Sequence, residues 1–424
     1  MPLAEIDSCA VLGVQAGSPQ WAVRKAYLAA ALSTHPDKPG GNAEAFQKVA
    51  QAYANLSSVK AASSNTVSVE ASRRTWTCGG YIYAVAAEPG CSVIAVGDNQ
   101  SIILIDYEQC FGRESTTRRF AARSVRDGPV GLLACCLFLD GQNAAVGASD
   151  GSVHCITILG KNKDSEIWQH PERRPIIAMV AKSSFIVCAA ADCAHFYVLS
   201  LSLDSDLPIE VFAVRRISSS QGGQIDAIAL SDNFLVTSGS RQDADSGFVS
   251  CWKLDASEPL DSNHTNESDA QDIHLWTVLE DEPVFSVAAR RSLLAWVSGP
   301  TCKTFDILTE QSPAESPIWT QYSEGRELRA VSISPLGGLV AACGVDEAVY
   351  VWHHPSGTVA AVFHLNNVIH CCLATSCINC ITFTCDGCCV VTGGYDSKVT
   401  IWQLPDSLCA LQSEKSQNLI GRTE

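Results

Sequence analysis

Seven stretches of similar pattern recur between residues 101 and 404, at intervals of about 40 to 55 residues. Each is a short β-type run, taken here as the penultimate strand of its unit, and Gly, Asp and Asn turns separate the runs. The stretches are SIILIDY (101–107), GSVHCITI (151–158), AHFYVL (194–199), GFVSCWKL (247–254), CKTFDIL (302–308), EAVYVWHH (347–354) and SKVTIWQL (397–404). One four-stranded unit cannot bury both faces of its sheet, whereas seven in a ring can. The pattern therefore predicts an all-β, seven-bladed propeller.

An acidic residue precedes several of these stretches in a tight turn. The four turn acids are Asp150, Asp192, Asp346 and Asp396. A carboxylate pair for acid–base catalysis is the functional alternative, but residues that recur once per blade are better explained as turn stabilisers. The sequence also has no Gly-rich phosphate loop, no nucleophile elbow and no H-E-x-x-H pattern. We therefore expect a protein that is not an enzyme and needs no cofactor.

The first 60 residues have helical rather than strand periodicity. Ser18 and Pro19 form a good helix start, and the helix ends at His35-Pro36 because a residue before proline is disfavoured in the α region. Asn42 caps a second amphipathic helix, so the region is predicted to be a helical hairpin. The predicted core positions of this module are Leu12, Val23, Tyr27, Phe46, Val49, Tyr53 and Leu56.

The motifs CAVLGV, VRKAY, HPDK and AFQKVAQAYANLS, in this order and spacing, resemble the J domain of the DnaJ family. The resemblance implies a module that docks on a 70-kDa heat-shock chaperone and stimulates its ATPase. The residues that would make this contact are His35, Pro36, Asp37, Lys38, Arg24 and Lys25. The chain departs from the family where further basic residues are usual, because it has Leu28, Ala29 and Ser33 there.

The last two repeat units, SISPLGGLVAACGVDEAVYVW and TFTCDGCCVVTGGYDSKVTIW, resemble WD repeats. The earlier units are degenerate, and the Gly-His pair common in WD repeats is absent. We therefore predict a small all-α J domain (1–60), a polar linker (61–77), an all-β WD-repeat propeller (78–404) and a tail (405–424). The strand-like segment from Thr66 to Glu70 in the linker is a candidate for the strand that closes the ring.

Net charge and the lengths of the apolar runs indicate which classes of partner and which compartment to expect. The net charge is −16, and residues 1–60 hold five Lys/Arg against four Asp/Glu, so the remainder carries −17, which disfavours nucleic-acid binding. The apolar runs are shorter than the roughly 20 residues that span a membrane. No secretory signal is recognisable at the N-terminus, which predicts the cytosol or nucleus.

Twenty cysteines in such a chain are expected to be reduced and mostly buried. Two C-x-x-C pairs, Cys377/Cys380 and Cys385/Cys388, have spacings that zinc sites use. The second pair encloses the Asp386-Gly387 turn, and Cys380 belongs to the preceding strand, where side chains alternate between faces. We therefore expect structural thiols and no metal.

The combined pattern predicts a J-domain co-chaperone whose propeller binds a protein client or scaffold. The alternative is a WD-repeat scaffold or ubiquitin-ligase substrate receptor whose J domain is weak or vestigial. The intact His35-Pro36-Asp37 loop favours the first, and the sequence does not name the client.

Overall fold

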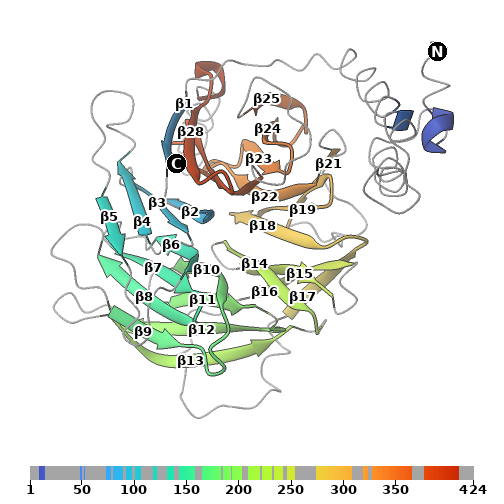
Figure 1. The fold of residues 1–424 in the computed structure, drawn as a ribbon. Helices are drawn as coiled ribbons and strands as arrows, with labels where there is room; N and C mark the ends of the chain where they lie inside the picture. The colour runs from blue at the N-terminus through green and yellow to red at the C-terminus, as the bar shows by residue number, and fades with distance from the viewer. Residues whose placement is uncertain are drawn as a thin grey trace, which may run out of the picture.

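The structure is a computed structural model of the 424-residue chain. It describes residues 9–14, 48–49, 52, 73–77, 80–88, 92–97, 101–106, 118–121, 131–137, 143–157, 165–182, 185–191, 193–202, 209–219, 222–231, 234–241, 246–253, 274–307, 319–322, 327–364 and 377–409. The described part is almost entirely β-strand, which agrees with an all-β propeller (Figure 1).

Seven four-stranded antiparallel sheets make up the described part of the propeller. Their strands, in sheet order, are β2 (Ile82–Glu88), β3 (Ser92–Gly97), β4 (Ser101–Asp106) and β5 (Arg118–Ala121); β6 (Leu132–Leu137), β7 (Asn143–Ala148), β8 (Ser152–Thr157) and β9 (Ser165–Gln169); β10 (Ile176–Lys182), β11 (Phe185–Ala190), β12 (His195–Ser202) and β13 (Glu210–Ser218); β14 (Gln224–Leu230), β15 (Phe234–Ser240), β16 (Gly247–Lys253) and β17 (His274–Glu280); β18 (Val284–Arg290), β19 (Leu293–Ser298), β20 (Thr301–Asp306) and β21 (Trp319–Tyr322); β22 (Leu328–Ile333), β23 (Leu339–Gly344), β24 (Ala348–His353) and β25 (Val359–His364); and β26 (Ile378–Phe383), β27 (Cys389–Gly394), β28 (Lys398–Gln403) and β1 (Arg73–Thr77).

The first strand of each sheet lies at the centre of the ring (Figure 1). Each inner strand packs against that of the next sheet, from β2 and β6 around to β26, which packs against β2 again. The repeated stretches of the sequence fall on the third strand of each sheet, from β4 to β28.

The core lies between neighbouring sheets, and this explains the apolar middle strands. All six residues of β23 and all six of β27 are buried, because an adjoining sheet covers each face. Large side chains fill the gaps between sheets, among them Trp352 and Trp402. In two sheets a tryptophan also donates to a threonine on the neighbouring strand, since Trp252 Nε1 lies 3.0 Å from Thr237 Oγ1 and Trp402 Nε1 lies 2.9 Å from Thr392 Oγ1.

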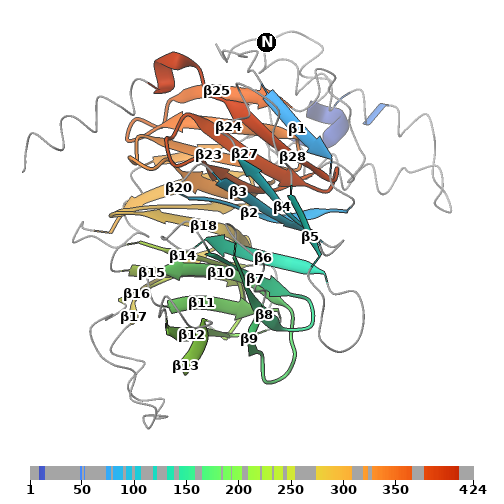
Figure 2. The ribbon, with the colours of Figure 1, turned by 90° about the vertical axis from the view of Figure 1, so that its left-hand side faces the viewer.

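Strand β1 completes the last sheet from the other end of the chain. It pairs antiparallel with β28 over five residues, from Arg73 opposite Trp402 to Thr77 opposite Lys398. Figure 2 shows β1 alongside β28 at the outer side of the ring. The closing strand is therefore Arg73–Thr77, whereas the candidate Thr66 to Glu70 lies outside the described residues.

The packed part of the propeller also extends past residue 404, the predicted boundary with the tail. Residues 406–409 are helical, and Leu408 is buried in the same cluster as Trp402 and Leu404. Among the described residues, no helix has the length and apolar character needed to cross a membrane.

Candidate functional site

The turn acids take part in one repeated hydrogen-bonding pattern. In three turns the carboxylate accepts the backbone N–H two residues later: Asp150 from Ser152 at 3.0 Å, Asp346 from Ala348 at 3.3 Å and Asp396 from Lys398 at 3.1 Å. This contact holds the turn between the second and third strands of a sheet. Asp192 lies outside the described residues.

Two of these turns place a non-glycine residue in the left-handed region directly after the acid. Glu347 has a φ of 58° and Ser397 a φ of 60°, and glycine takes the same place at Gly151, with a φ of 85°. Burial raises the pKa of Asp396, while the N–H of Lys398 and its charge act in the opposite direction. The bonding is that of a structural turn residue.

The most elaborate polar site lies between the second and third sheets. Residues 170–175, of sequence His-Pro-Glu-Arg-Arg-Pro, connect β9 to β10, and we name this segment the arginine loop. The Nδ1 atom of His170 accepts the backbone N–H of Glu172 at 3.1 Å and that of Arg174 at 3.4 Å. The N–H of Arg173 donates to the His170 carbonyl at 2.9 Å. The loop is thus folded around one imidazole.

Because Nδ1 is an acceptor, His170 must be neutral with its proton on Nε2. The pKa of His170 is lowered, first by burial and then by the positive charges of Arg174 and Arg216, while Glu172 acts in the opposite direction. The ring is 1% exposed and lies edge-on to Tyr197 and Trp168, with centroids 5.2 and 5.9 Å away. At neutral pH the imidazole therefore keeps the form that the loop needs.

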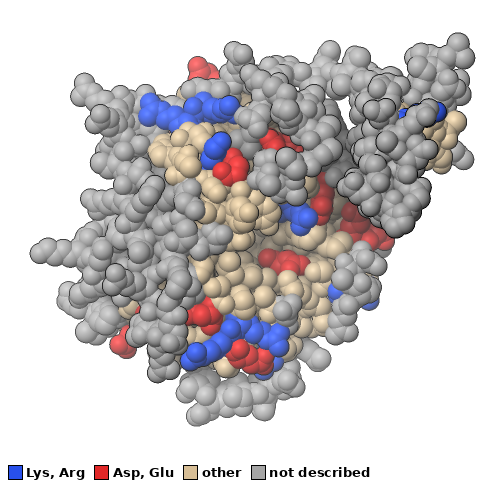
Figure 3. Space-filling view, viewed as in Figure 1, with Lys and Arg blue, Asp and Glu red and all other residues tan. Residues whose placement is uncertain are grey.

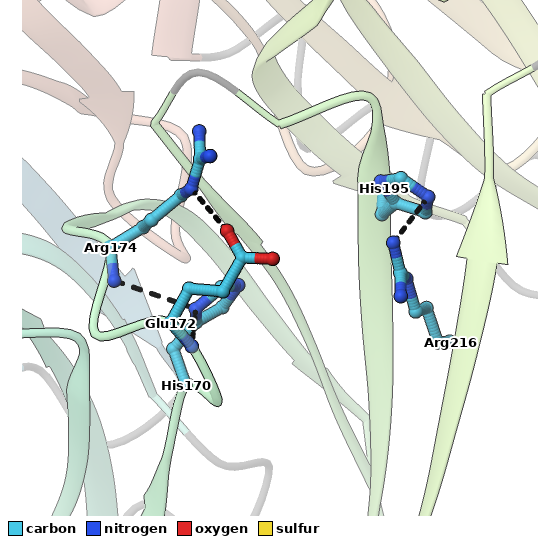
Figure 4. A network of polar contacts seen from close by, with 5 residues as sticks. All are labelled: His170, Glu172, Arg174, His195 and Arg216. Atoms are coloured by element: carbon cyan, nitrogen blue, oxygen red, sulfur yellow. Dashed lines mark hydrogen bonds and ion pairs between the residues drawn. The ribbon is translucent and has the colours of Figure 1, made fainter.

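One ion pair lies within the loop and one hydrogen bond lies beside it between β12 and β13, and Figure 4 shows both. On the loop, Arg174 Nε donates to Glu172 at 2.8 Å, and this bond is the main reason why the pKa of Glu172 is lowered. Across from it, Arg216 near the end of β13 donates to Nε2 of His195, which begins β12, at 2.7 Å. An arginine can only donate, so Nε2 of His195 is unprotonated.

The cysteines of the two C-x-x-C pairs have separate surroundings. Cys380 Sγ contacts the Gly393 carbonyl at 3.4 Å, whereas Cys388 Sγ contacts the Asp386 carbonyl at 3.7 Å. Burial raises the pKa of Cys377 to about 11 and that of Cys388 to about 12. Within the described ranges, no group of three or more His, Cys, Asp or Glu side chains is placed to hold a metal ion.

The thiols should differ sharply in reactivity. In native protein at pH 8, iodoacetamide should modify the partly exposed Cys385 and Cys409 on the order of tenfold faster than the buried Cys251 and Cys302, since alkylation needs an accessible thiolate. Burial raises the pKa of Cys251 to about 12 and that of Cys302 further. Peptide mass spectrometry reports the rates, and labelling in denaturant serves as the control. Equal native rates at Cys302 and Cys385 would contradict the assigned packing.

The helical module is described only in part. Residues 9–12 are helical and end at Gly13, whose φ of 69° and bond from Val14 N to Cys9 O at 3.0 Å form a helix C-cap. Leu12 and Val49, two predicted core positions, are buried. The other predicted residues lie outside the described part: the core positions Val23, Tyr27, Phe46, Tyr53 and Leu56, and the chaperone contacts Arg24, Lys25, His35, Pro36, Asp37 and Lys38.

Comparison with known proteins finds a match for each of the two parts of the chain. The family model for the DnaJ domain matches residues 7–63, and the model for the WD domain, G-beta repeat, matches residues 366–403. Among solved structures, the WD40 β-propeller domain of Doa1 is similar with a TM-score of 0.57 and 13% identity, over 80% of this chain and 98% of that chain. A search of curated proteins found no similar sequence. The chain thus combines a DnaJ domain with a WD-repeat β-propeller.

The arginine loop was not among the sites predicted from the sequence. The sequence nevertheless has a recognisable feature there, because two prolines enclose two consecutive arginines in a chain with an excess of acidic residues. Arg216 and His195 had no comparable signal, since they join the loop only when β12 and β13 pack beside it.

Proposed function

We propose that this protein is a co-chaperone. Its J domain docks on a 70-kDa heat-shock chaperone and stimulates ATP hydrolysis, while the propeller, with each of its seven sheets as a blade, binds a client or scaffold protein. The observation that carries the proposal is the DnaJ match over residues 7–63, which spans the His35-Pro36-Asp37 loop and both flanking helical stripes.

The chain itself performs no chemistry in this proposal and works in the cytosol or nucleus. His35 and Asp37 offer polar contacts to a basic cleft of the chaperone, and Pro36 restricts the loop between them. Arg24 and Lys25 steer the encounter. The propeller supplies specificity, because binding residues on such a scaffold lie in its turns and loops.

Loss of the loop contacts should abolish ATPase stimulation. With full-length protein, His35→Gln or Asp37→Asn should return the single-turnover ATP hydrolysis rate of a cognate chaperone to its basal value, because the docking loop loses its polar groups. The helical circular dichroism should stay unchanged. Lys48→Gln, a charge change in the second predicted helix and outside the His35-Pro36-Asp37 motif, is the matched control and should retain stimulation. Stimulation that is equal in the loop variants and the wild type would rule out the co-chaperone proposal.

The second candidate is a scaffold or ubiquitin-ligase substrate receptor with a vestigial J domain. Leu28, Ala29 and Ser33 favour it, because they stand where DnaJ relatives usually carry basic residues. The same assay separates the two functions, since a vestigial domain gives no stimulation even for the wild-type protein at high concentration.

A further inference from the structure

The arginine loop carries charged side chains on a conformationally restricted backbone. Pro171 and Pro175 enclose it and restrict its backbone. Arg173 has a φ of 55°, a left-handed conformation that is unfavourable for a non-glycine residue and persists only where the surroundings impose it. The imposed contacts are the two N–H bonds to His170 Nδ1 described above.

The turn between β7 and β8 supports the loop from below. His170 N donates to the Gly151 carbonyl at 2.9 Å, and Gln169 Nε2 donates to the Asp150 carbonyl at 2.8 Å. A Cβ on Gly151 would meet the Arg174 carbonyl oxygen at 2.8 Å, so the loop rests directly on this glycine. A ligand that binds the loop would lose little free energy in ordering it.

The loop brings positive charge together on a strongly acidic protein. Arg173 is exposed on the loop, Arg174 is half-buried, and the exposed Arg216 on β13 lies close enough for its charge to lower the pKa of both His170 and Glu172. Against these three positive charges stands the exposed Glu172, which leaves a surplus of two. In the supporting turn, Oδ1 of Asp150 accepts from both N and Oγ of Ser152.

Basic side chains are gathered in patches on the surface of the ring rather than spread evenly over it. On the face drawn in Figure 3, basic side chains gather over β12 and β13 with acidic ones among them, and a second basic group lies at the top over β1 and β28, whereas the hollowed centre of the ring is mostly uncharged. The whole chain has a net charge of −16, so a basic cluster stands out against its background.

We propose that the arginine loop, together with Arg216, binds an acidic peptide segment of a partner protein through the partner's carboxylates. The bond between Glu172 and Arg174 shows that a carboxylate fits this guanidinium, and a partner's Glu or Asp would take the place of Glu172 or occupy Arg173 and Arg216. This inference rests on the proposed protein-binding role of the propeller and is independent of the J-domain loop.

Binding of a defined acidic peptide tests the site. The probe is a fluorescein-labelled peptide of about ten residues in which Glu alternates with Ser and Gly, measured by fluorescence anisotropy with the full chain. Arg173→Ala and Arg216→Ala should each weaken binding about two- to fivefold, the range expected for an exposed ion pair, and the effect should shrink as salt rises. Glu172→Ala should strengthen binding, because it releases Arg174 from its internal partner.

A control variant and a control peptide distinguish binding at the arginine loop from non-specific attraction between charges. Arg290→Ala removes an exposed arginine at the opposite end of an inner strand and should leave the affinity unchanged. A peptide with Gln in place of Glu should not bind. Equal weakening by Arg290→Ala, no change in Arg216→Ala, or binding only when the peptide serines are phosphorylated would overturn the proposal. His35→Gln should leave peptide binding intact, so failure here and failure of the co-chaperone function are distinguishable.

Discussion

A chain that starts at Tyr81 should unfold at a markedly lower temperature than one that starts at Ser64, because only the shorter chain lacks β1. Five cross-strand pairs with β28 are lost, and β28 becomes an exposed edge. Trp76 packs against the cluster that contains Val391, Val399 and Ile401, so its contribution is lost as well. We expect a loss of about 3 kcal/mol or more in the free energy of unfolding, measured in urea.

Two side chains of β1 make further contacts that the shorter chain would lose. Arg73 lies over the ring of Trp402, 5.5 Å from its centroid, and its guanidinium donates to the His364 carbonyl at 3.2 Å, so it joins the last two sheets. Thr75 Oγ1 lies 3.2 Å from Thr400 Oγ1. A synthetic peptide with the sequence of residues 71–80 should partly restore the melting temperature of the short chain by adding the missing strand. Identical melting temperatures for the two chains would show that β1 contributes nothing to ring closure.

The closing strand shows where sequence patterns are sufficient and where they are not. The strands that repeat along the chain are recognisable because alternation and turn residues are local properties. The choice of the closing strand is not local, since the segment from Thr66 to Glu70 alternates as well as Arg73–Thr77 does. What favours the latter is its partner, because Trp76 pairs with Val399 and enters the core between the last sheet and the first.

The polar sites also divide into those that a local pattern predicts and those that depend on packing between strands. The turn acids Asp150, Asp346 and Asp396 could be predicted, since each bonds to a backbone N–H two residues away. The partnership of Arg216 with His195 depends on the register of β12 with β13, which no local pattern specifies. The J-domain motifs were recognisable because their order and spacing are unusual together, although each motif alone is common.

Glu280→Ala should be one of the most destabilising single substitutions in the propeller. Glu280 ends β17 and reaches the next sheet, where one carboxylate oxygen accepts from Trp296 Nε1 at 2.8 Å and the other from Lys303 Nζ at 2.5 Å. Trp296 and Lys303 are directly opposed on β19 and β20, so the carboxylate fastens two sheets together. The substitution leaves a buried indole N–H unsatisfied and a largely buried ammonium unpaired.

The expected cost of Glu280→Ala is about 3 kcal/mol, at the lower end for a broken buried pair because Lys303 keeps some contact with water. Glu280→Gln should cost less, since an amide oxygen still accepts from Trp296. The double variant Glu280→Leu with Lys303→Met should recover the part of the loss that comes from the unpaired ammonium, because it removes both charges together, whereas the indole N–H of Trp296 stays unsatisfied. Glu327→Gln at the more exposed pair with Arg329 is the control and should cost less than about 1 kcal/mol. Urea unfolding that gives equal losses for Glu280→Ala and Glu327→Gln would mean that the carboxylate does not join the two sheets.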